Sequence, residues 1–340
     1  MARSSLACLV ACALAASGCE RFVERQVEST LQRADQSLLE SPALHVVLCG
    51  TGSPLPDPDR AAACTAVIAG GHFFLVDAGP GSWEQVDLAN LPTGALRGVF
   101  LTHFHSDHVG DLGEAITQSW IAGRAQPLDV YGPPGVARVV AGFAEALAAD
   151  VEARVAHHGD AYMPRAAAGA VARETALGDA PNASAVVFDQ DGLRVTMFAV
   201  DHEPVRPAVG YRFDWKGRSL VVSGDTRKSA SVIEHAKGAD LLVHEALAAS
   251  FTERAVATAK RIGMERLAKL AGDIPSYHTT PREAGEVAQA AGVAHLVLSH
   301  MVPAPSNFLV RRSFQKDAES AFSGEVTLGE DGMRFLLAPE

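Results

Sequence analysis

The stretch "LTHFHSDHVGD", residues 101–111, places three histidines and an aspartate within six positions, directly after the apolar run "GVFL". The four side chains are His103, His105, Asp107 and His108. Neutral imidazole and carboxylate are ligands for zinc and similar metals. One turn cannot direct all four side chains at a single ion without strain, but it can offer two to one ion and two to a neighbouring ion. The stretch therefore predicts a strand that ends at a two-metal site.

Other apolar runs in the chain also carry polar residues at their C-terminal ends. In α/β sheets the carboxyl ends of the strands fan open, and functional sites assemble there. We therefore expect these residues to gather around the histidine turn. They are Asp201 and His202 after "RVTMFAV", Asp225 and Thr226 after "SLVVSG", His244 and Glu245 after "ADLLV", and His300 after "AHLVLS".

Length and composition favour one large α/β domain over residues 44–340. The chain has 340 residues, of which 48% are hydrophobic, so it can bury a sizeable core. Strand and helix patterns mix along it without a break in composition after residue 43. The formal net charge of -11 argues against a broad basic face, so we expect no nucleic-acid partner.

Turn residues and apolar periodicity divide this domain into elements. Glycine-containing turns at Gly70-Gly71, Asp191-Gly192 and Lys216-Gly217 predict three hairpins. Residues 150–185 are rich in alanine with weak periodicity, so we expect an insertion or covering loop without chemistry there. Apolar spacing predicts helices over residues 112–123, 135–149, 229–237, 253–271 and 281–291.

The N-terminus has the pattern of a secretory signal peptide over residues 1–19. One arginine precedes an apolar run and small residues, and Ala16-Ser17-Gly18-Cys19 resembles a bacterial lipoprotein box with Cys19 as the lipidated residue. We expect export to the periplasm or cell envelope with a lipid anchor in the membrane. Cleavage with release is the main alternative, and a cytoplasmic protein is another. Residues 20–43 predict an amphipathic spacer helix.

Two cysteines, Cys49 and Cys64, lie in the body of the chain. An exported chain permits a disulfide between them. The sequence leaves a disulfide and two small buried thiols as equal alternatives.

The motifs together resemble the metallo-β-lactamase superfamily from Leu44 to the C-terminus. "HFHSDH" lies between an upstream "DAGPG" and a downstream "GDT". The resemblance implies a four-layered αββα sandwich. Within the superfamily, "LCGTGSP", "HVGDL", "YGPPG", "SGDT", "HEA", "HTTPREA" and "LSH" resemble the ribonuclease Z-like branch, which includes phosphodiesterases and arylsulfatases. Together with export, "TGSPLPDPDR" and "GRAQPLDVYGPPG" are most similar to the arylsulfatases.

The resemblance implies two zinc ions, for which manganese or iron could substitute. It also implies that Asp77, in "LVDAGPG", orients the histidine turn through hydrogen bonds. The metal ligands implied by matching positions are His103, His105 and His202 for one ion, Asp107, His108 and His300 for the other, and Asp225 as the bridge.

The implied mechanism uses a metal-bound water as the nucleophile. By resemblance, His278 in "YHTTP" supplies a proton to the leaving group and Glu245 is its partner. Asp107 is a candidate acceptor for the proton of the water. The two carboxylate ligands leave a dinuclear site with positive charge, which favours anionic ester substrates.

We therefore expect a dinuclear zinc hydrolase of small anionic esters, aryl sulfates or phosphodiesters, in a branch where homodimers are common. A 3′-processing ribonuclease is the first alternative. Export argues against it, as do the 22 residues between His202 and Asp225, which leave no room for the tRNA-binding arm of that family. A lactonase or β-lactamase is the second alternative. A binding protein without catalysis conflicts with the full set of ligands.

Overall fold

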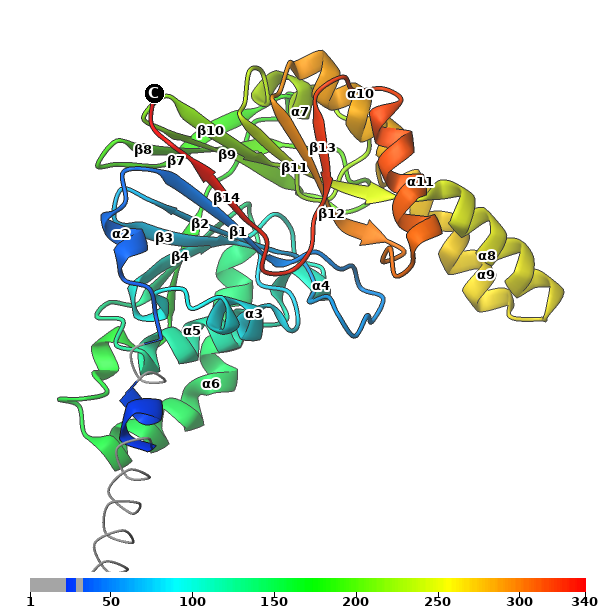
Figure 1. Ribbon diagram of the computed structural model, residues 1–340. Coiled ribbons are helices and arrows are strands. Elements are labelled where there is room, and N and C mark those ends of the chain that lie inside the picture. Colours follow the sequence, from blue (N-terminus) through cyan, green and yellow to red (C-terminus); the bar gives the residue numbers. More distant parts are fainter. Residues whose placement is uncertain (1–22, 29–32) are drawn as a thin grey trace, which may run out of the picture.

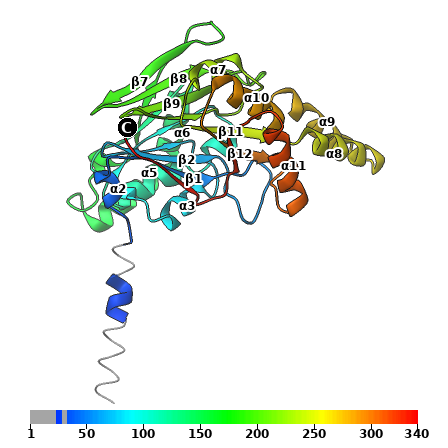
Figure 2. The same ribbon diagram turned by 45° about the horizontal axis from the view of Figure 1, so that its top comes forward.

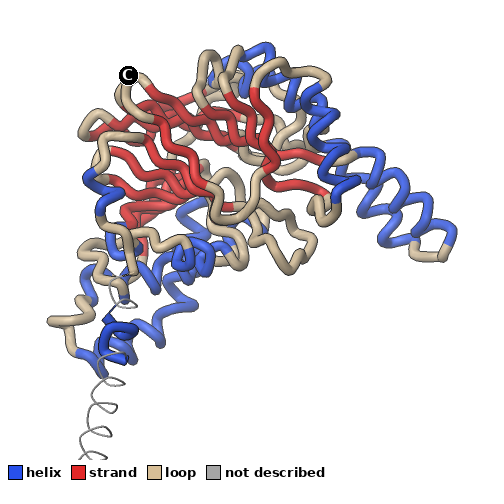
Figure 3. Tube along the Cα trace, in the orientation of Figure 1, coloured by secondary structure: helices blue, strands red, loops and turns tan. Residues whose placement is uncertain are grey.

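Two seven-stranded β-sheets stack face to face, and helices cover both outer faces (Figures 1 and 3). This is a computed structural model, and it describes residues 23–28 and 33–340. In the turned view of Figure 2, α3 and α5 lie on one side of the paired sheets, and α7 and α10 lie on the other. The arrangement confirms the predicted α/β fold with its four layers in the order αββα.

The first sheet has the strand order β14-β1-β2-β3-β4-β5-β6, and the second has the order β13-β12-β11-β10-β9-β8-β7. The strands of the first sheet are β1 (Leu44–Gly50), β2 (Cys64–Ala69), β3 (His72–Val76), β4 (Leu96–Phe100), β5 (Leu128–Gly132), β6 (Ala170–Glu174) and β14 (Arg334–Leu337). Those of the second sheet are β7 (Ser184–Gln190), β8 (Leu193–Ala199), β9 (Val209–Trp215), β10 (Arg218–Val222), β11 (Leu241–Leu247), β12 (His295–Val302) and β13 (Glu325–Leu328).

The helices fall into two groups, one for each sheet, and the pair α8–α9 extends beyond the sandwich (Figure 1). Those that precede β7 are α2 (Ser37–Glu40), α3 (Ser82–Leu88), α4 (Ser106–Val109), α5 (Leu112–Ile121) and α6 (Val136–His158). Those that follow are α7 (Ala230–His235), α8 (Ala249–Arg261), α9 (Glu265–Asp273), α10 (Pro281–Ala291) and α11 (Phe308–Glu319).

Aromatic side chains from both sheets fill the space between them. The ring of Phe100 in β4 lies 5.2 Å from Tyr211 and 5.5 Å from Phe213, measured between centroids. The Tyr211 hydroxyl donates a hydrogen bond of 2.7 Å to the carbonyl of Leu101. Because Leu101 immediately precedes the histidine turn, this bond fixes that turn relative to the second sheet.

The three predicted hairpin turns are confirmed as the β2–β3, β7–β8 and β9–β10 connections. Asp191 and Gly192 have φ values of 52° and 88°, and Lys216 and Gly217 have values of 46° and 79°. Two consecutive residues with positive φ are typical of the type I′ turn, whose twist matches that of the flanking strands.

The helix predictions need two corrections. Residues 150–185 are not a structureless insertion, because α6 continues to His158 and residues 170–174 form the edge strand β6. The helix predicted over 253–271 is two helices, α8 and α9, because Gly263 between them adopts φ 76°. A left-handed glycine ends a helix in this way.

The predicted spacer helix is interrupted. Residues 23–28 are helical, but residues 33–36 are not, and α2 has only four residues. The carboxylate of Asp35 accepts hydrogen bonds from the Ser37 amide at 3.1 Å and the Ser37 hydroxyl at 2.5 Å. Such a local bond competes with helical hydrogen bonding. The proposed signal peptide and Cys19 lie outside the described residues, and no helix in the described part has the length and apolar character needed to cross a membrane.

Cys49 and Cys64 form a disulfide between the neighbouring strands β1 and β2. Both cysteines are buried. The bond joins the two ends of the proline-rich segment. It decides between the disulfide and the two free thiols, which the sequence alone left as equal alternatives.

Candidate metal centre

The histidine turn forms the centre of a buried polar cluster at one edge of the sandwich. His103 follows β4, and the short helix α4 carries Asp107 and His108. Gly79 of "DAGPG" packs against this helix so closely that a Cβ atom there would lie 2.1 Å from the Asp107 carbonyl oxygen. The glycine in that motif is therefore required by the approach of α4.

The seven residues expected to bind metal lie together in two groups. In the first, ligand-type atoms of His103, His105, His202 and Asp225 all lie within 4.8 Å of one another. These side chains come from the β4–α4 loop, the segment after β8 and the segment after β10. Three of the four residues are buried, and His105 is exposed. The exposed imidazole gives this group an open side toward solvent.

The second group consists of Asp107, His108 and His300. His300 Nε2 lies 3.1 Å from Asp107 Oδ2, and His108 Nε2 lies 3.6 Å from the same oxygen. His300 is inside β12, not beyond its end as predicted.

Asp225 lies between the two groups. Its Oδ2 is 3.8 Å from His103 Nε2 and from His202 Nε2, and 3.4 Å from His108 Nε2. Its Oδ1 is 3.6 Å from His300 Nε2. One carboxylate that faces both groups has an oxygen for each of two ions.

Unpartnered polar atoms in this cluster fit metal ions. The Nε2 atoms of His103, His108 and His202 and the Oδ1 atom of Asp225 are buried and have no hydrogen-bond partner. A buried polar atom without a partner costs about 1–3 kcal/mol, and four of them in one place are rare in a folded protein. A lone pair on each atom suits coordination to a cation.

The opposite ring nitrogens of the same histidines have hydrogen-bond partners. His108 Nδ1 is 2.8 Å from Asp77 Oδ2, and His202 Nδ1 is 3.0 Å from the carbonyl oxygen of Tyr277. Asp77 also accepts hydrogen bonds of 2.8 Å from the amide and hydroxyl of Thr102. Acceptors at Nδ1 keep the proton there and leave Nε2 free for a metal.

Two residues of the cluster have unusual backbone conformations. Asp77 has φ 60° and His300 has φ 44°, so both lie in the left-handed region. Non-glycine residues there cost about 1–3 kcal/mol and persist only where surrounding contacts hold them. For Asp77 those contacts are the hydrogen bonds from Thr102 and His108.

Burial and neighbouring charge set the ionisation of the cluster. Burial opposes ionisation of Asp225, but His300 and His108 outweigh it and hold the pKa of Asp225 well below its usual range. Burial, aided by His108, lowers the pKa of His103 well below its usual value. Burial also opposes protonation of His108, but Asp225 and Asp77 raise the pKa of His108 well above its usual value. Asp225 and His103 are therefore in the forms that bind metal, whereas His108 must lose a proton first.

His278 and Glu245 form a buried pair beside the cluster. His278 Nδ1 lies 2.9 Å from Glu245 Oε1, and the same oxygen accepts hydrogen bonds of 3.1 Å from the amides of Thr226 and Thr279. Burial would lower the pKa of His278, but the charge and hydrogen bond of Glu245 raise it to about 9. His278 also has a ring nitrogen close to Asp225 and His300, so it faces the reaction site.

Sequence reasoning missed three contributors to this cluster: Thr102, Thr279 and the carbonyl group of Tyr277. Thr102 precedes His103 in "LTH", and its position at a strand end was the one available signal. The carbonyl of Tyr277 carries no signal, because any residue type has one. His244 lies in β11, where its Nδ1 is 2.8 Å from the carbonyl oxygen of Glu245.

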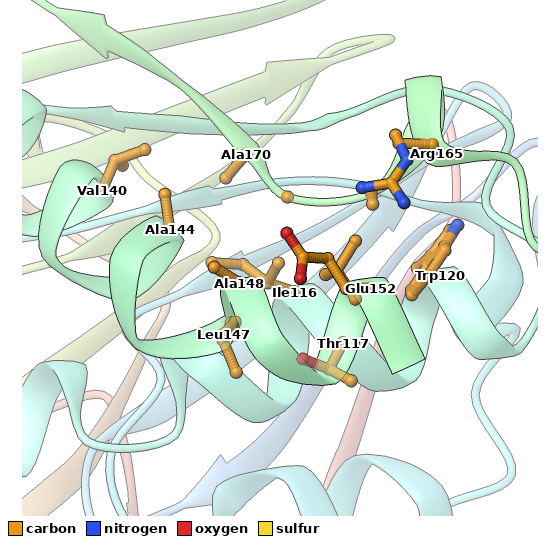
Figure 4. Close-up of a pocket in the computed structure, with 13 residues that line it drawn as sticks. Ile116, Thr117, Trp120, Val140, Ala144, Leu147, Ala148, Glu152, Arg165 and Ala170 are labelled. Carbon is orange, nitrogen blue, oxygen red and sulfur yellow. The ribbon is translucent and has the colours of Figure 1, made fainter. Parts of the chain in front are cut away.

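Besides a small cavity of about 30 Å³ lined by His108, Asp225 and His300, three larger cavities lie around the cluster. One of about 550 Å³ lies under the proline-rich segment and reaches Asp107, and one of about 500 Å³ reaches His278. The third, of about 630 Å³, reaches Phe104. Another cavity of about 230 Å³ lies between α5 and α6 and is lined by none of the seven expected metal ligands (Figure 4).

Comparisons with known proteins agree in sequence and in fold. A family model described as a beta-lactamase superfamily domain matches residues 72–301. A ribonuclease Z of Mycolicibacterium paratuberculosis is 40% identical over 294 residues, which cover 85% of this chain and 96% of that protein. A ribonuclease Z of Mycobacterium bovis is 36% identical over 301 residues, which cover 87% of this chain and 99% of that protein.

Solved structures share the fold at lower sequence identity. The short form of human tRNase Z has a TM-score of 0.63 at 23% identity, with 87% of this chain and 100% of that chain covered. A metallo-beta-lactamase fold protein of Bacillus subtilis has a TM-score of 0.61 at 21% identity, with 86% and 99% covered.

Proposed function

Because this chain belongs to the metallo-β-lactamase superfamily, in its ribonuclease Z-like branch, we propose that it is a metal-dependent phosphodiesterase that cleaves RNA. Membership makes it a metal-dependent hydrolase. The specific proposal is carried by one observation: buried, unpartnered ligand atoms lie on both sides of Asp225, in a chain with ribonucleases among its full-length relatives.

We assign each group of side chains to one ion. His103, His105 and His202 would hold the first ion, and Asp225 would be shared with the second. Asp107, His108 and His300 would hold the second. Two zinc ions, for which manganese or iron could substitute, supply a nucleophilic hydroxide and positive charge for the phosphoryl group. Asp77 holds the ring of His108 in place through its Nδ1 atom.

We assign His278 as the proton donor to the leaving oxygen. Glu245 accepts the hydrogen bond from its Nδ1 and raises the pKa of His278 to about 9, so the ring is protonated on both nitrogens near neutral pH and its Nε2 has a proton to give away. Asp107 belongs to the second group of ligands, with His108 and His300. It is the candidate to accept the proton that the nucleophilic water loses. General acid catalysis of this kind contributes typically about 10² to 10⁴ in rate.

The expectation that no nucleic acid takes part is wrong, because the relatives at 36–40% identity are ribonucleases. The net charge of -11 describes the whole chain, whereas binding of a phosphodiester depends on the local field of a cleft. Metal ions and a few arginines can make that field positive in an acidic protein.

The test is hydrolysis by metal-loaded protein of four substrates: a tRNA precursor with a 3′ trailer, bis-p-nitrophenyl phosphate, p-nitrophenyl sulfate and an acyl-homoserine lactone. The proposal predicts cleavage of the two phosphodiesters. An Asp225→Asn variant is the control, since it retains volume but loses one bridging charge. Activity on the sulfate or the lactone alone would refute the proposal.

Hydrolysis of small aryl esters, including aryl sulfates, is the second candidate. The observation that favours it is the short connection between His202 and Asp225, in which β9 and β10 form one hairpin. A chain without an arm has less surface for a folded tRNA and suits a small or unstructured substrate.

We propose that the chain is exported, which would separate it from cellular tRNA precursors and leave other RNA or small esters as its substrates. The apolar N-terminal run that ends at Cys19 and the disulfide between Cys49 and Cys64 support it, because disulfides persist in oxidising compartments. Mass spectrometry of the mature N-terminus tests it, and a chain that begins at Met1 would refute it.

A further inference from the structure

A cavity with aromatic and arginine side chains borders the metal centre and has no part in the chemistry described above. We name it the aromatic–arginine pocket and define it by Phe104, Phe143, Arg138 and Arg206, which line it. Its volume is about 630 Å³. Phe104 lies between His103 and His105 in the chain and connects the pocket to the first group of ligands, although none of the seven ligand residues lines the pocket itself.

Close contacts hold both rings of the pocket in place. The ring of Phe104 packs on Gly135, where a Cβ atom would lie 2.7 Å from it, and Gly135 has φ 113°. The ring of Phe143 packs on Gly113, where a Cβ atom would lie 3.1 Å from it. Both rings are partly buried, so each has one face against the protein and part of its surface toward the pocket. Fixed rings of this kind form a stacking platform for a planar group.

The charge of the pocket is positive. No carboxylate is among its lining residues. Arg138 in α6 has no side-chain partner among the residues of 23–28 and 33–340. Arg206 forms an ion pair with Glu203, but its side chain is 79% exposed, so it is also accessible from the pocket. An unpaired guanidinium beside aromatic rings suits a phosphate next to a base.

A glycine in α6 lies beside open space in the pocket. Gly142 lies in the middle of α6 and lines the pocket, and a Cβ atom there would meet nothing within 4 Å. Glycine weakens a helix interior relative to alanine, so the helix forgoes stability at this position.

We propose that the aromatic–arginine pocket binds the nucleotide that retains the phosphate during RNA cleavage, with its base on Phe104 and Phe143 and its next phosphate at Arg138. This inference rests on the proposed function. His278, the donor to the leaving oxygen, lines a different cavity, so the leaving group extends there. The retained nucleotide must then lie in another cavity, and the aromatic–arginine pocket is the one that offers a surface for base stacking.

Three p-nitrophenyl phosphodiesters with the same leaving group test the proposal. Their retained groups are methyl, thymidine attached through its 5′ oxygen, and the same thymidine with a 3′-phosphate. Because the leaving group is constant, a difference in kcat/KM reports on the retained group alone. The variants are Phe143→Ala, Gly142→Trp, which fills the pocket, and Arg138→Gln. Ala144→Trp, on the other face of α6 in the cavity of Figure 4, is the matched control.

Phe143→Ala and Gly142→Trp should each lower kcat/KM for the thymidine ester about tenfold, as expected for loss of one stacked base, and leave the methyl ester within about twofold. Arg138→Gln should lose about fivefold only on the ester with the 3′-phosphate. Ala144→Trp should change none of the three. Equal losses on the methyl and thymidine esters, or no loss on either, would overturn the proposal.

Calorimetry of thymidine 3′,5′-bisphosphate binding separates this proposal from the proposed function. Binding that Gly142→Trp weakens about tenfold or more supports the pocket even if the protein hydrolyses no phosphodiester. Binding that Gly142→Trp leaves unchanged, or no binding, overturns the pocket even if RNA is cleaved.

Discussion

Replacement of Glu245 by glutamine tests how the proton donor is tuned. Glu245 is buried, and its Oε1 atom accepts hydrogen bonds from the Thr226 and Thr279 amides and engages His278 Nδ1. Glutamine has the same volume and one amide oxygen that can accept the same three bonds. Glu245→Gln therefore removes the negative charge while it retains the packing.

The expected magnitude follows from the ionisation of His278. Its pKa of about 9 depends mainly on Glu245, which outweighs the effect of burial. Without that charge the pKa falls to about 6.5, the ordinary value, or below. The protonated fraction of His278 then drops about fourfold at pH 7 and about 30-fold at pH 8. Bound cations lower both pKa values alike, so the difference between the two proteins remains.

The assay is the pH profile of kcat for a substrate with a basic leaving group, such as a dinucleotide. The alkaline limb should move to lower pH in Glu245→Gln by about 2.5 pH units or more. A nitrophenyl ester, which has an acidic leaving group, should show little change. His278→Ala should retain both metals and lose the alkaline limb. A loss in Glu245→Gln that is equal at all pH values, or equal for both substrates, would refute the assignment.

Three further predictions concern metal binding and the disulfide. Asp77→Asn should weaken binding of the second metal about 10- to 100-fold, measured by competition with a chromophoric chelator; unchanged affinity would contradict its role in orienting His108. Because the pKa of His108 is raised, that metal should displace a proton and bind more weakly as pH falls; calorimetry in two buffers counts the proton, and zero release would contradict this. Replacing Cys49 and Cys64 by alanine should lower the free energy of unfolding by about 3 kcal/mol in urea titrations, and no change would show that the closed loop contributes nothing.

Much of the cluster could be predicted because its ligands occur close to the C-terminal parts of apolar runs. The spacing in "HFHSDH" is local, so it constrains His103, His105 and His108 without knowledge of the fold. His202 and His300 are about a hundred and two hundred positions further along; their places at the ends of apolar runs made them candidates, and the order of motifs in the resembling family assigned each to an ion. Their proximity depends on two sheets that pack against each other, which periodicity does not determine.

Other features depend on tertiary contacts that have no local pattern. The disulfide requires the β1–β2 register, in which Gly50 is opposite Cys64 after an irregularity. The carbonyl partner of His202 belongs to Tyr277, and nothing in that residue type indicates it. The interruption of the spacer at Asp35 arises from one side chain that competes with the backbone.

The prediction that no nucleic acid takes part was wrong because it used the net charge of the whole chain in place of the local charge of the cleft. A net charge of -11 predicts how the whole molecule behaves toward a distant polyanion, and salt screens that interaction within about 10 Å. A phosphodiester in the cleft meets only the groups within that distance. There the ligand set has two carboxylates, Asp77 and Glu245 lie beside it, and the adjoining pocket presents Arg138 and Arg206 without an acidic lining residue. We therefore expect the cavities around the centre to decide substrate choice, since the same ligands would serve a sulfate ester, a small phosphodiester or RNA.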